Sequence, residues 1–255
     1  MIKLIGIFLL FMSCVVNGQQ LTTIEQHTSQ IEQVSYYYLG TFNAIVGIPA
    51  GKGPFPVIIY SYDEVYDWAG EQLAGRMGYS LEGIARYFSQ KGYLCLIPIK
   101  RYRKVNAILG VTDYLKKVSI ANLESVHLVG MSEGAFFNMM VAQKRDIFKT
   151  MTVIAPIRVN DKGYLSADQF LYKELINTDM PILFLFVYDA GWRINQQLEF
   201  AKFLDLIYDD ITFKRFKKEK RWFYSVNRYG NVIDRFILKY NLKMLHESTQ
   251  SYESF

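Results

Sequence analysis

A serine between two glycines carries the most specific chemical signal in this sequence. Ser132 is the centre of Gly-Met-Ser-Glu-Gly, which spans residues 130–134 and follows an apolar stretch at residues 126–129. A stretch with helical period begins directly after the second glycine, at Ala135. A sharp turn between a strand and a helix lifts a serine hydroxyl clear of the sheet edge, and flanking glycines let the two elements pass closely. The segment therefore predicts a nucleophilic serine at a strand–turn–helix junction.

The same turn presents a backbone donor beside the serine. Glu133 directly follows Ser132, at the start of the predicted helix. Backbone N–H groups at a helix start point outward and favour negative charge. We therefore expect the Glu133 amide to point toward the place where an oxyanion forms when the serine attacks an acyl group.

Strand-like and helix-like segments alternate around this serine. Continuous apolar runs are typical of strands that are covered on both faces, as in parallel sheets. The runs lie at residues 56–60, 94–98, 126–129, 151–155 and 182–187, and the segments with helical period lie at residues 80–90, 105–117, 135–145, 195–208 and 231–244. The pattern predicts an α/β fold with a doubly wound, mostly parallel sheet and helices on both faces. Residues 42–49 are suited to an edge strand of this sheet.

Composition limits the remaining possibilities. A chain of 255 residues that is 51% hydrophobic suits one buried core. Much of the net charge of +5 lies in the basic residues of segment 214–221. We interpret that run as a solvated strand end and loop, and no nucleic-acid partner is expected, because no aromatic stacking platform accompanies it. The scattered histidines offer no zinc spacing and no Gly-rich loop is suited to phosphate, so no metal or other cofactor is expected.

The beginning of the chain indicates export. Residues 1–18 have the charged start and short apolar centre of a secretory signal peptide, whereas a membrane helix needs about 20 apolar residues. Cleavage after Gly18 is one route. In the other, Cys14 is acylated and retained, because residues 11–14 resemble a lipoprotein box. Both routes predict a periplasmic or secreted protein without a transmembrane span in the mature chain, and they leave Cys95 without an internal disulfide partner.

The serine junction and its surrounding pattern resemble the α/β-hydrolase superfamily, most closely its dienelactone-hydrolase-like and small esterase members. The resemblance covers roughly residues 40–243 and so implies a hydrolase domain at 41–243. The composition of the flanking segments adds the signal peptide at 1–18, an N-terminal extension at 19–40 and a polar tail at 244–255. Residues 54–61 look like the family's third strand, so the Tyr62 amide is expected to join that of Glu133 in an oxyanion hole. Residues 160–179 leave room for only a small lid.

The resemblance also implies a catalytic order of serine, acid and histidine. Residues 180–189 resemble the strand that ends in the acid, which makes Asp189 the expected acid. After the last predicted strand, residues 211–216, the family places a loop histidine that is followed by an aromatic residue. Here the matching residues are Arg221 and Trp222. The sequence therefore departs from the family at the position of the catalytic base.

The three histidines of the chain offer little replacement. His27 precedes the predicted domain, His127 lies inside the strand before the serine, and His246 follows a helix that should lead away from the active edge. An arginine remains charged and cannot accept the serine proton. We expect Asp189 and Arg221 to form an ion pair instead.

Two functions follow from the sequence. The first is a serine hydrolase of esters or related acyl compounds, impaired by loss of the histidine unless another base such as Asp63 or Glu64 serves. The second is an inactive pseudo-hydrolase that binds a small-molecule ligand or a partner in the former active-site cleft, where Arg221 would attract an anionic group. A single recent substitution of the histidine would also leave the rest of the site unchanged. The substrate does not follow from the residues.

Overall fold

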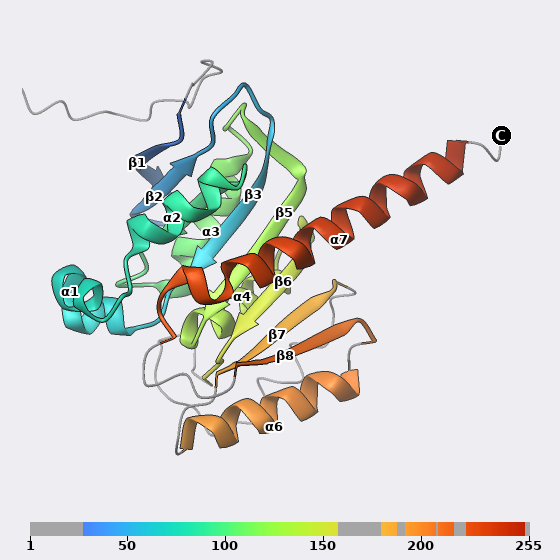
Figure 1. Cartoon of the computed structure of the whole chain (residues 1–255). Helices are drawn as coiled ribbons and strands as arrows, with labels where there is room; N and C mark the ends of the chain where they lie inside the picture. The colour runs from blue at the N-terminus through green and yellow to red at the C-terminus, as the bar shows by residue number, and fades with distance from the viewer. Residues whose placement is uncertain (1–27, 158–179, 188–191, 208, 217–222, 253–255) are drawn as a thin grey trace, which may run out of the picture.

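The computed structural model describes residues 28–157, 180–187, 192–207, 209–216 and 223–252. Within these ranges it describes the side chains of all residues except 192, 193, 207 and 243–252. Within these residues the chain forms one sheet of eight strands (Figure 1). The strands are β1 (Gln30–Tyr37), β2 (Thr41–Ile48), β3 (Phe55–Ser61), β4 (Leu94–Pro98), β5 (Ala121–Met131), β6 (Phe148–Ile154), β7 (Ile182–Val187) and β8 (Ile211–Phe216). The helices are α1 (Val65–Arg76), α2 (Leu81–Gln90), α3 (Lys104–Leu115), α4 (Glu133–Ala142), α6 (Trp192–Ile207) and α7 (Val226–Tyr252).

The strand order is β1-β2-β4-β3-β5-β6-β7-β8. β1 pairs antiparallel with β2, and β2 pairs antiparallel with β4, whereas the pairs from β4 through β8 are parallel. Because β3, β5, β6 and β7 are parallel, their carboxyl ends lie at one edge of the sheet. Segments that follow these strands are therefore brought together, although they are far apart in the sequence.

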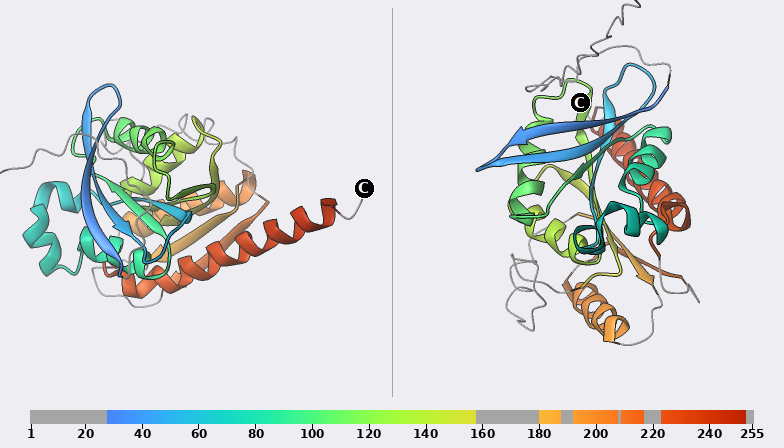
Figure 2. Two further views of the ribbon diagram at one scale, coloured as in Figure 1. Left: turned by 90° about the horizontal axis from the view of Figure 1, so that it is seen from above. Right: turned by 90° about the vertical axis from the view of Figure 1, so that its left-hand side faces the viewer.

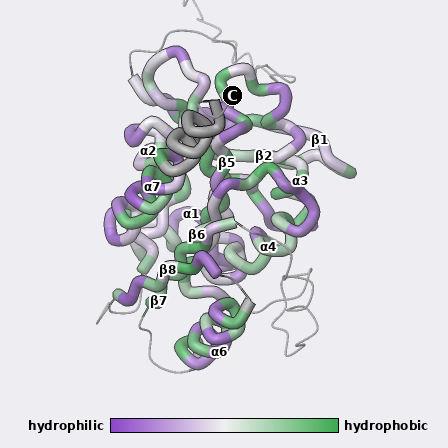
Figure 3. Tube along the Cα trace, turned by 90° about the vertical axis from the view of Figure 1, so that its right-hand side faces the viewer, coloured by the Kyte–Doolittle hydropathy of each residue, from purple (hydrophilic) through white to green (hydrophobic). Residues whose placement is uncertain are grey.

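Helices cover both faces of the sheet (Figure 2). One apolar cluster joins α3, α4 and α6 to the sheet, and the other joins α2 and α7 to the opposite face. Successive residues of β3 alternate between them: Val57 and Ile59 belong to the first cluster, and Ile58 and Tyr60 to the second. Continuous apolar runs therefore arise because both faces are buried, which confirms the predicted doubly wound α/β fold. Figure 3 shows purple and green alternating along α6 and α7, as expected for helices with one face on the sheet.

Two elements depart from the sequence-based expectations. The edge strand is β1 rather than residues 42–49, which form β2 with partners on both sides. β1 carries no continuous apolar run, because only Tyr36 of its side chains is buried. Helix α1 was also not predicted, since it buries only Val65 and Ala74 and Gly70 interrupts its helical backbone. A weakly buried element leaves a weak hydrophobic period in the sequence.

The structure also bears on the ends of the predicted domain. The sheet begins at Gln30, ahead of the boundary expected at residue 41, and α7 continues through the expected tail to Tyr252. Residues 1–18, Cys14 and the expected lid at 160–179 lie outside the described residues. Across the described part of the chain, no helix is long and apolar enough to span a membrane. Cys95 is buried on β4 as a free thiol, and burial raises its pKa.

Candidate active site

Ser132 occupies a strained turn between β5 and α4. Its backbone has φ of 56° and ψ of −123°, in the left-handed half of conformational space that non-glycine residues rarely adopt. A Cβ atom added to Gly130 would lie 2.4 Å from Cα of Ala135, and one added to Gly134 would lie 2.2 Å from the carbonyl oxygen of Ser61. Both glycines are therefore required by close backbone approach. The strand–turn–helix junction predicted around Ser132 is present.

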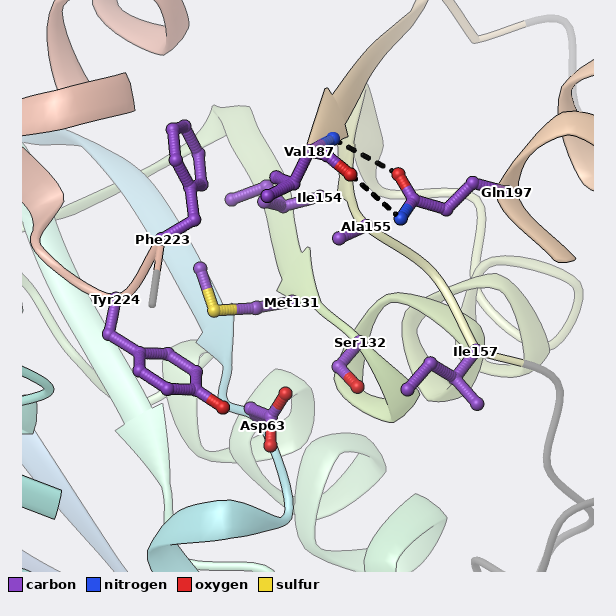
Figure 4. Close-up of a pocket in the computed structure, with 10 residues that line it drawn as sticks. All are labelled: Asp63, Met131, Ser132, Ile154, Ala155, Ile157, Val187, Gln197, Phe223 and Tyr224. Atoms are coloured by element: carbon purple, nitrogen blue, oxygen red, sulfur yellow. Dashed lines mark hydrogen bonds between the residues drawn. The ribbon is translucent and has the colours of Figure 1, made fainter. Parts of the chain in front are cut away.

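The Ser132 side chain faces a small cavity at the carboxyl edge of the sheet (Figure 4). The cavity has a volume of about 50 Å³, which is room for a few atoms of a ligand. Four of the residues that line it carry polar side chains, namely Asp63, Ser132, Gln197 and Tyr224. The other lining residues are Met131, Ile154, Ala155, Ile157, Val187 and Phe223. The Ser132 Oγ is buried and has no hydrogen-bond partner among the described residues. A buried hydroxyl without a partner, aimed at a cavity, is suited to a reaction with a bound molecule.

The strand ends on either side of the serine complete this arrangement. The Ser132 N–H donates to the Ile154 carbonyl at 2.8 Å, which joins the turn to the end of β6. Ala155 follows with φ of 43°, so a second non-glycine residue in the left-handed region lines the cavity. Strain of this kind is held by the surrounding structure and is common at functional sites.

Gln197, for which the sequence raised no expectation, fixes the end of β7. Its Oε1 accepts from the Val187 N–H at 3.0 Å, and its Nε2 donates to the Val187 carbonyl at 3.1 Å (Figure 4). The expected acid, Asp189, lies two positions beyond Val187, outside the described residues. Because a glutamine on a helix has no distinctive spacing, the sequence held no signal for this contact.

Asp63 is the carboxylate that the fold brings to the serine. It is 5% exposed, lines the cavity, and its Oδ1 accepts from the Val65 N–H at 2.8 Å. Its own N–H donates to the Tyr79 hydroxyl at 2.7 Å. Glu64, the other carboxylate considered as a base, does not line the cavity. Of the two alternatives, Asp63 therefore shares the cavity with Ser132 and Glu64 does not.

Buried tyrosines support the Asp63 side of the cavity. The rings of Tyr79 and Tyr224 lie 4.6 Å apart, and Figure 4 shows the Tyr224 hydroxyl directed toward the Asp63 carboxylate. Beneath them the hydroxyls of Tyr60 and Tyr229 are 2.9 Å apart. Burial raises the pKa of Tyr60, Tyr79 and Tyr229 well above 10, so these hydroxyls remain neutral. They position neighbouring groups rather than act as bases.

Tyr62 and Glu133, the expected oxyanion-hole residues, lie on adjoining segments. A Cβ atom at Gly134 would lie 2.7 Å from the Tyr62 carbonyl oxygen, so the start of α4 contacts the backbone that follows β3. The role of the two amides stays a prediction. The Glu133 carboxylate is buried in ion pairs with Lys100 and Lys104, and burial lowers the pKa of Lys100.

His127 and His246 lie on elements that hold them away from Ser132. His127 is fully buried on β5, where Nε2 lies 2.9 Å from Ser125 Oγ and Nδ1 lies 2.9 Å from Thr150 Oγ1. Ser132 lies five positions further along the chain, or about 16 Å in extended backbone. His246 lies on α7, about 30 Å along the helix from Val226, and Figure 1 shows α7 leading away from the carboxyl edge.

Arg221, which the sequence places where the family has its histidine, falls outside the part of the chain that the structure describes. The same is true of His27, which was not expected to reach the site. Among the residues that the structure describes, no group of three or more His, Cys, Asp or Glu side chains is arranged to hold a metal ion.

The chain is similar to known proteins in its three-dimensional structure and not in its sequence. No protein-family model and no curated protein sequence matches the chain. A fungal esterase from Rhizomucor miehei superimposes with a TM-score of 0.64 at 15% identity, covering 87% of this chain and 87% of the esterase. A Klebsiella pneumoniae protein assigned as a dienelactone hydrolase gives 0.58 at 13% identity, covering 84% of this chain and 100% of that chain. The acylaminoacyl peptidase of Pyrococcus horikoshii gives 0.60 at 14% identity, with 83% of this chain covered.

These likenesses define the class of fold. The chain spans 42% of the Pyrococcus peptidase, whereas it covers nearly all of the other two proteins. At such low identity the comparison establishes the architecture alone. Together with the elbow at Ser132, it shows that the chain has the α/β-hydrolase fold, as the sequence resemblance predicted.

Proposed function

We propose that the protein is a serine hydrolase of esters or related acyl compounds, with Ser132 as its nucleophile. The observation that carries this proposal is the strained Ser132 turn, which directs a buried, unpartnered hydroxyl into a cavity. Ser132 Oγ would attack the acyl carbon and expel the alcohol, and water would then release the acid. The described part of the cavity has room for a small acyl group close to the serine.

The backbone amides of Tyr62 and Glu133 would stabilise the oxyanion of each tetrahedral intermediate. The contact between Gly134 and the Tyr62 backbone supports this role, because it holds the two segments together. Preorganised donors of this kind contribute strongly to acyl transfer, since the loss of one costs about 10²- to 10³-fold in rate. Asp189 is assigned as the acid of the site from the sequence resemblance.

Turnover should be slow, because Arg221 stands where the resemblance places a histidine. In the serine protease subtilisin, removal of the histidine alone lowers kcat about 2 × 10⁶-fold. Asp63 is the proposed substitute base, since its carboxylate shares the cavity with Ser132. A carboxylate is a weak base at neutral pH, so we expect it to give a low rate.

A second candidate function is binding without catalysis. The same arrangement, with Arg221 in place of a base, would suit a pseudo-hydrolase that holds a small-molecule ligand or a partner in the former cleft. The small cavity favours a ligand of few atoms or the tip of a larger group. For both functions we propose export, through cleavage after Gly18 or acylation of Cys14, to the periplasm or outside the cell.

The deciding experiment compares hydrolysis of short p-nitrophenyl esters by wild type, Arg221→His and Ser132→Ala. Ser89→Ala serves as a matched control, because Ser89 is equally buried but lies on α2 and does not line the cavity. Slow wild-type hydrolysis that Ser132→Ala abolishes would support the hydrolase. An inert wild type with Ser132-dependent activity in Arg221→His would support the pseudo-hydrolase. Measurable wild-type hydrolysis that Ser132→Ala retains in full would rule out Ser132 as the nucleophile.

A further inference from the structure

A group of buried charges lies beside the elbow and does not line the cavity. The Lys100 side chain is fully buried just beyond β4, and its Nζ lies 2.8 Å from Oε1 of Glu133, which is 1% exposed. Lys104, 15% exposed on α3, pairs with both oxygens of the same carboxylate at 2.9 Å. Removing a lysine and a glutamate from water costs several kcal/mol per ion. Because two apolar side chains in the same place would avoid this cost, we look for a role that requires the charges of Lys100 and Glu133.

Lys100 also contacts the second expected oxyanion-hole residue. Its backbone N–H donates to the Tyr62 hydroxyl at 2.9 Å, and its Nζ lies 4.1 Å from the centre of the Tyr62 ring. The Tyr62 hydroxyl in turn donates to Asp67 Oδ1 at 2.8 Å. A cation over an aromatic face is attracted by the ring, and more strongly where water is excluded. The Tyr62 side chain is therefore held by Lys100 from two directions.

One side chain thus connects the two residues whose amides are proposed to bind the oxyanion. Glu133 is held through its carboxylate and Tyr62 through its ring, and both contacts converge on Lys100 Nζ. Lys104 differs in this respect, since its ammonium group contacts Glu133 and the ring of Phe137. Displacing a donor by a fraction of an ångström weakens its bond to a developing charge.

We propose that Lys100 is a positioning residue that sets the spacing of the Tyr62 and Glu133 amides. The expected effect of Lys100 on the reaction rate rests on the proposed function. The expected effect of Lys100 on the positions of the two amides rests on the fold alone. Lys100 lines no part of the cavity, so it acts through Tyr62 and Glu133 and does not touch the substrate.

The test compares Lys100→Met, Lys104→Met and the triple variant that combines these two changes with Glu133→Gln. The first readout is the backbone amide NMR signals of Tyr62 and Glu133, which require no activity. We expect Lys100→Met to shift both signals and Lys104→Met to shift only that of Glu133. If Lys100→Met leaves the Tyr62 amide signal in place, the positioning role is wrong.

The second readout is the rate at which a p-nitrophenyl alkylphosphonate modifies Ser132, because the phosphonyl oxygen occupies the place of the oxyanion. We expect Lys100→Met to slow the limiting rate about 10- to 100-fold with little change in the half-saturating concentration, since the oxyanion forms only in the transition state. Lys104→Met should slow it less. An equal effect of the two lysine variants would overturn the proposal.

The triple variant separates positioning from stability. It removes all three charges of the group, Lys100, Lys104 and Glu133, so no buried charge is left without a partner and the folded protein should be at least as stable as Lys100→Met. If Lys100 positions the amides, the phosphonylation rate stays low in the triple variant. Recovery of the rate together with stability would show a merely structural role. A wild type that the phosphonate does not modify would refute the proposed hydrolase, and the amide signals would still decide the role of Lys100.

Discussion

The amide of Gln197 makes its two hydrogen bonds to a single residue, with Oε1 accepting from the Val187 N–H and Nε2 donating to the Val187 carbonyl. The Gln197 side chain thereby makes the hydrogen bonds that the backbone of a neighbouring strand would otherwise make to the last residue of β7. The next residues along the chain lead to the expected acid, Asp189. The conformation in which β7 ends therefore depends on a side chain from α6.

Replacing Gln197 by Ala should destabilise the protein by about 1 to 3 kcal/mol, because the Val187 N–H and carbonyl are left without partners in a buried position. Ester hydrolysis or phosphonylation should fall as well. Urea unfolding and rate measurements check the two effects. Gln196→Ala is the matched control, since Gln196 Oε1 has no hydrogen-bond partner among the described residues. Similar losses in both variants would contradict the role of Gln197.

Gly134→Ala should cost about 2 to 3 kcal/mol of unfolding free energy, because the added Cβ meets backbone oxygens that cannot move independently. It should also separate the start of α4 from the Tyr62 segment and lower reactivity at Ser132. Gly75→Ala in α1 is the control, since a Cβ there meets nothing within 4 Å. That variant should be neutral or more stable by up to about 1 kcal/mol. Urea denaturation measures both.

Asp63→Asn should abolish the residual ester hydrolysis that we attribute to Asp63 as base. The substitution keeps an oxygen that accepts from the Val65 N–H, so the turn before α1 is preserved. Glu64→Gln changes the neighbouring carboxylate, which does not line the cavity, and should leave the rate within about twofold of wild type. Hydrolysis that survives unchanged in Asp63→Asn would assign the base elsewhere.

His127 should make the protein less stable in acid. Burial, and to a lesser degree Lys149, lowers its pKa from 6.5 to about 3 in the folded protein. Between these values the unfolded chain binds the proton and the folded protein does not. Stability is therefore complete above pH 6.5 and falls by about 1.4 kcal/mol per pH unit as the pH decreases toward 3.

Urea unfolding of wild type and His127→Gln at several pH values between 4 and 7.5 measures this contribution. The variant should be less stable at neutral pH, because the contacts with Ser125 and Thr150 are lost. Its stability should also depend less steeply on pH than that of wild type. Parallel pH profiles would show that His127 titrates normally in the folded protein.

Local sequence was sufficient to predict the elements around the serine. The strand–turn–helix junction at Ser132 depends on glycines two positions before and two positions after it, and two-sided burial of the strands leaves continuous apolar runs. Both signals act over a few residues, so they predicted the α/β-hydrolase fold and the position of the elbow. The weakly buried β1 and α1 left no such signal and were missed.

The composition of the site depended on contacts between distant segments. Asp63 and Glu64 are neighbours with the same chemistry, and only the path of the chain after β3 places Asp63 in the cavity with Ser132. Gln197 and Lys100 have no motif, because their partners, Val187 and Glu133, are close in space but separated along the chain. Local patterns report how each segment buries its own side chains, whereas the carboxyl edge of a parallel sheet collects residues from many segments. That difference is why the nucleophile could be predicted from its neighbours and its supporting residues could not.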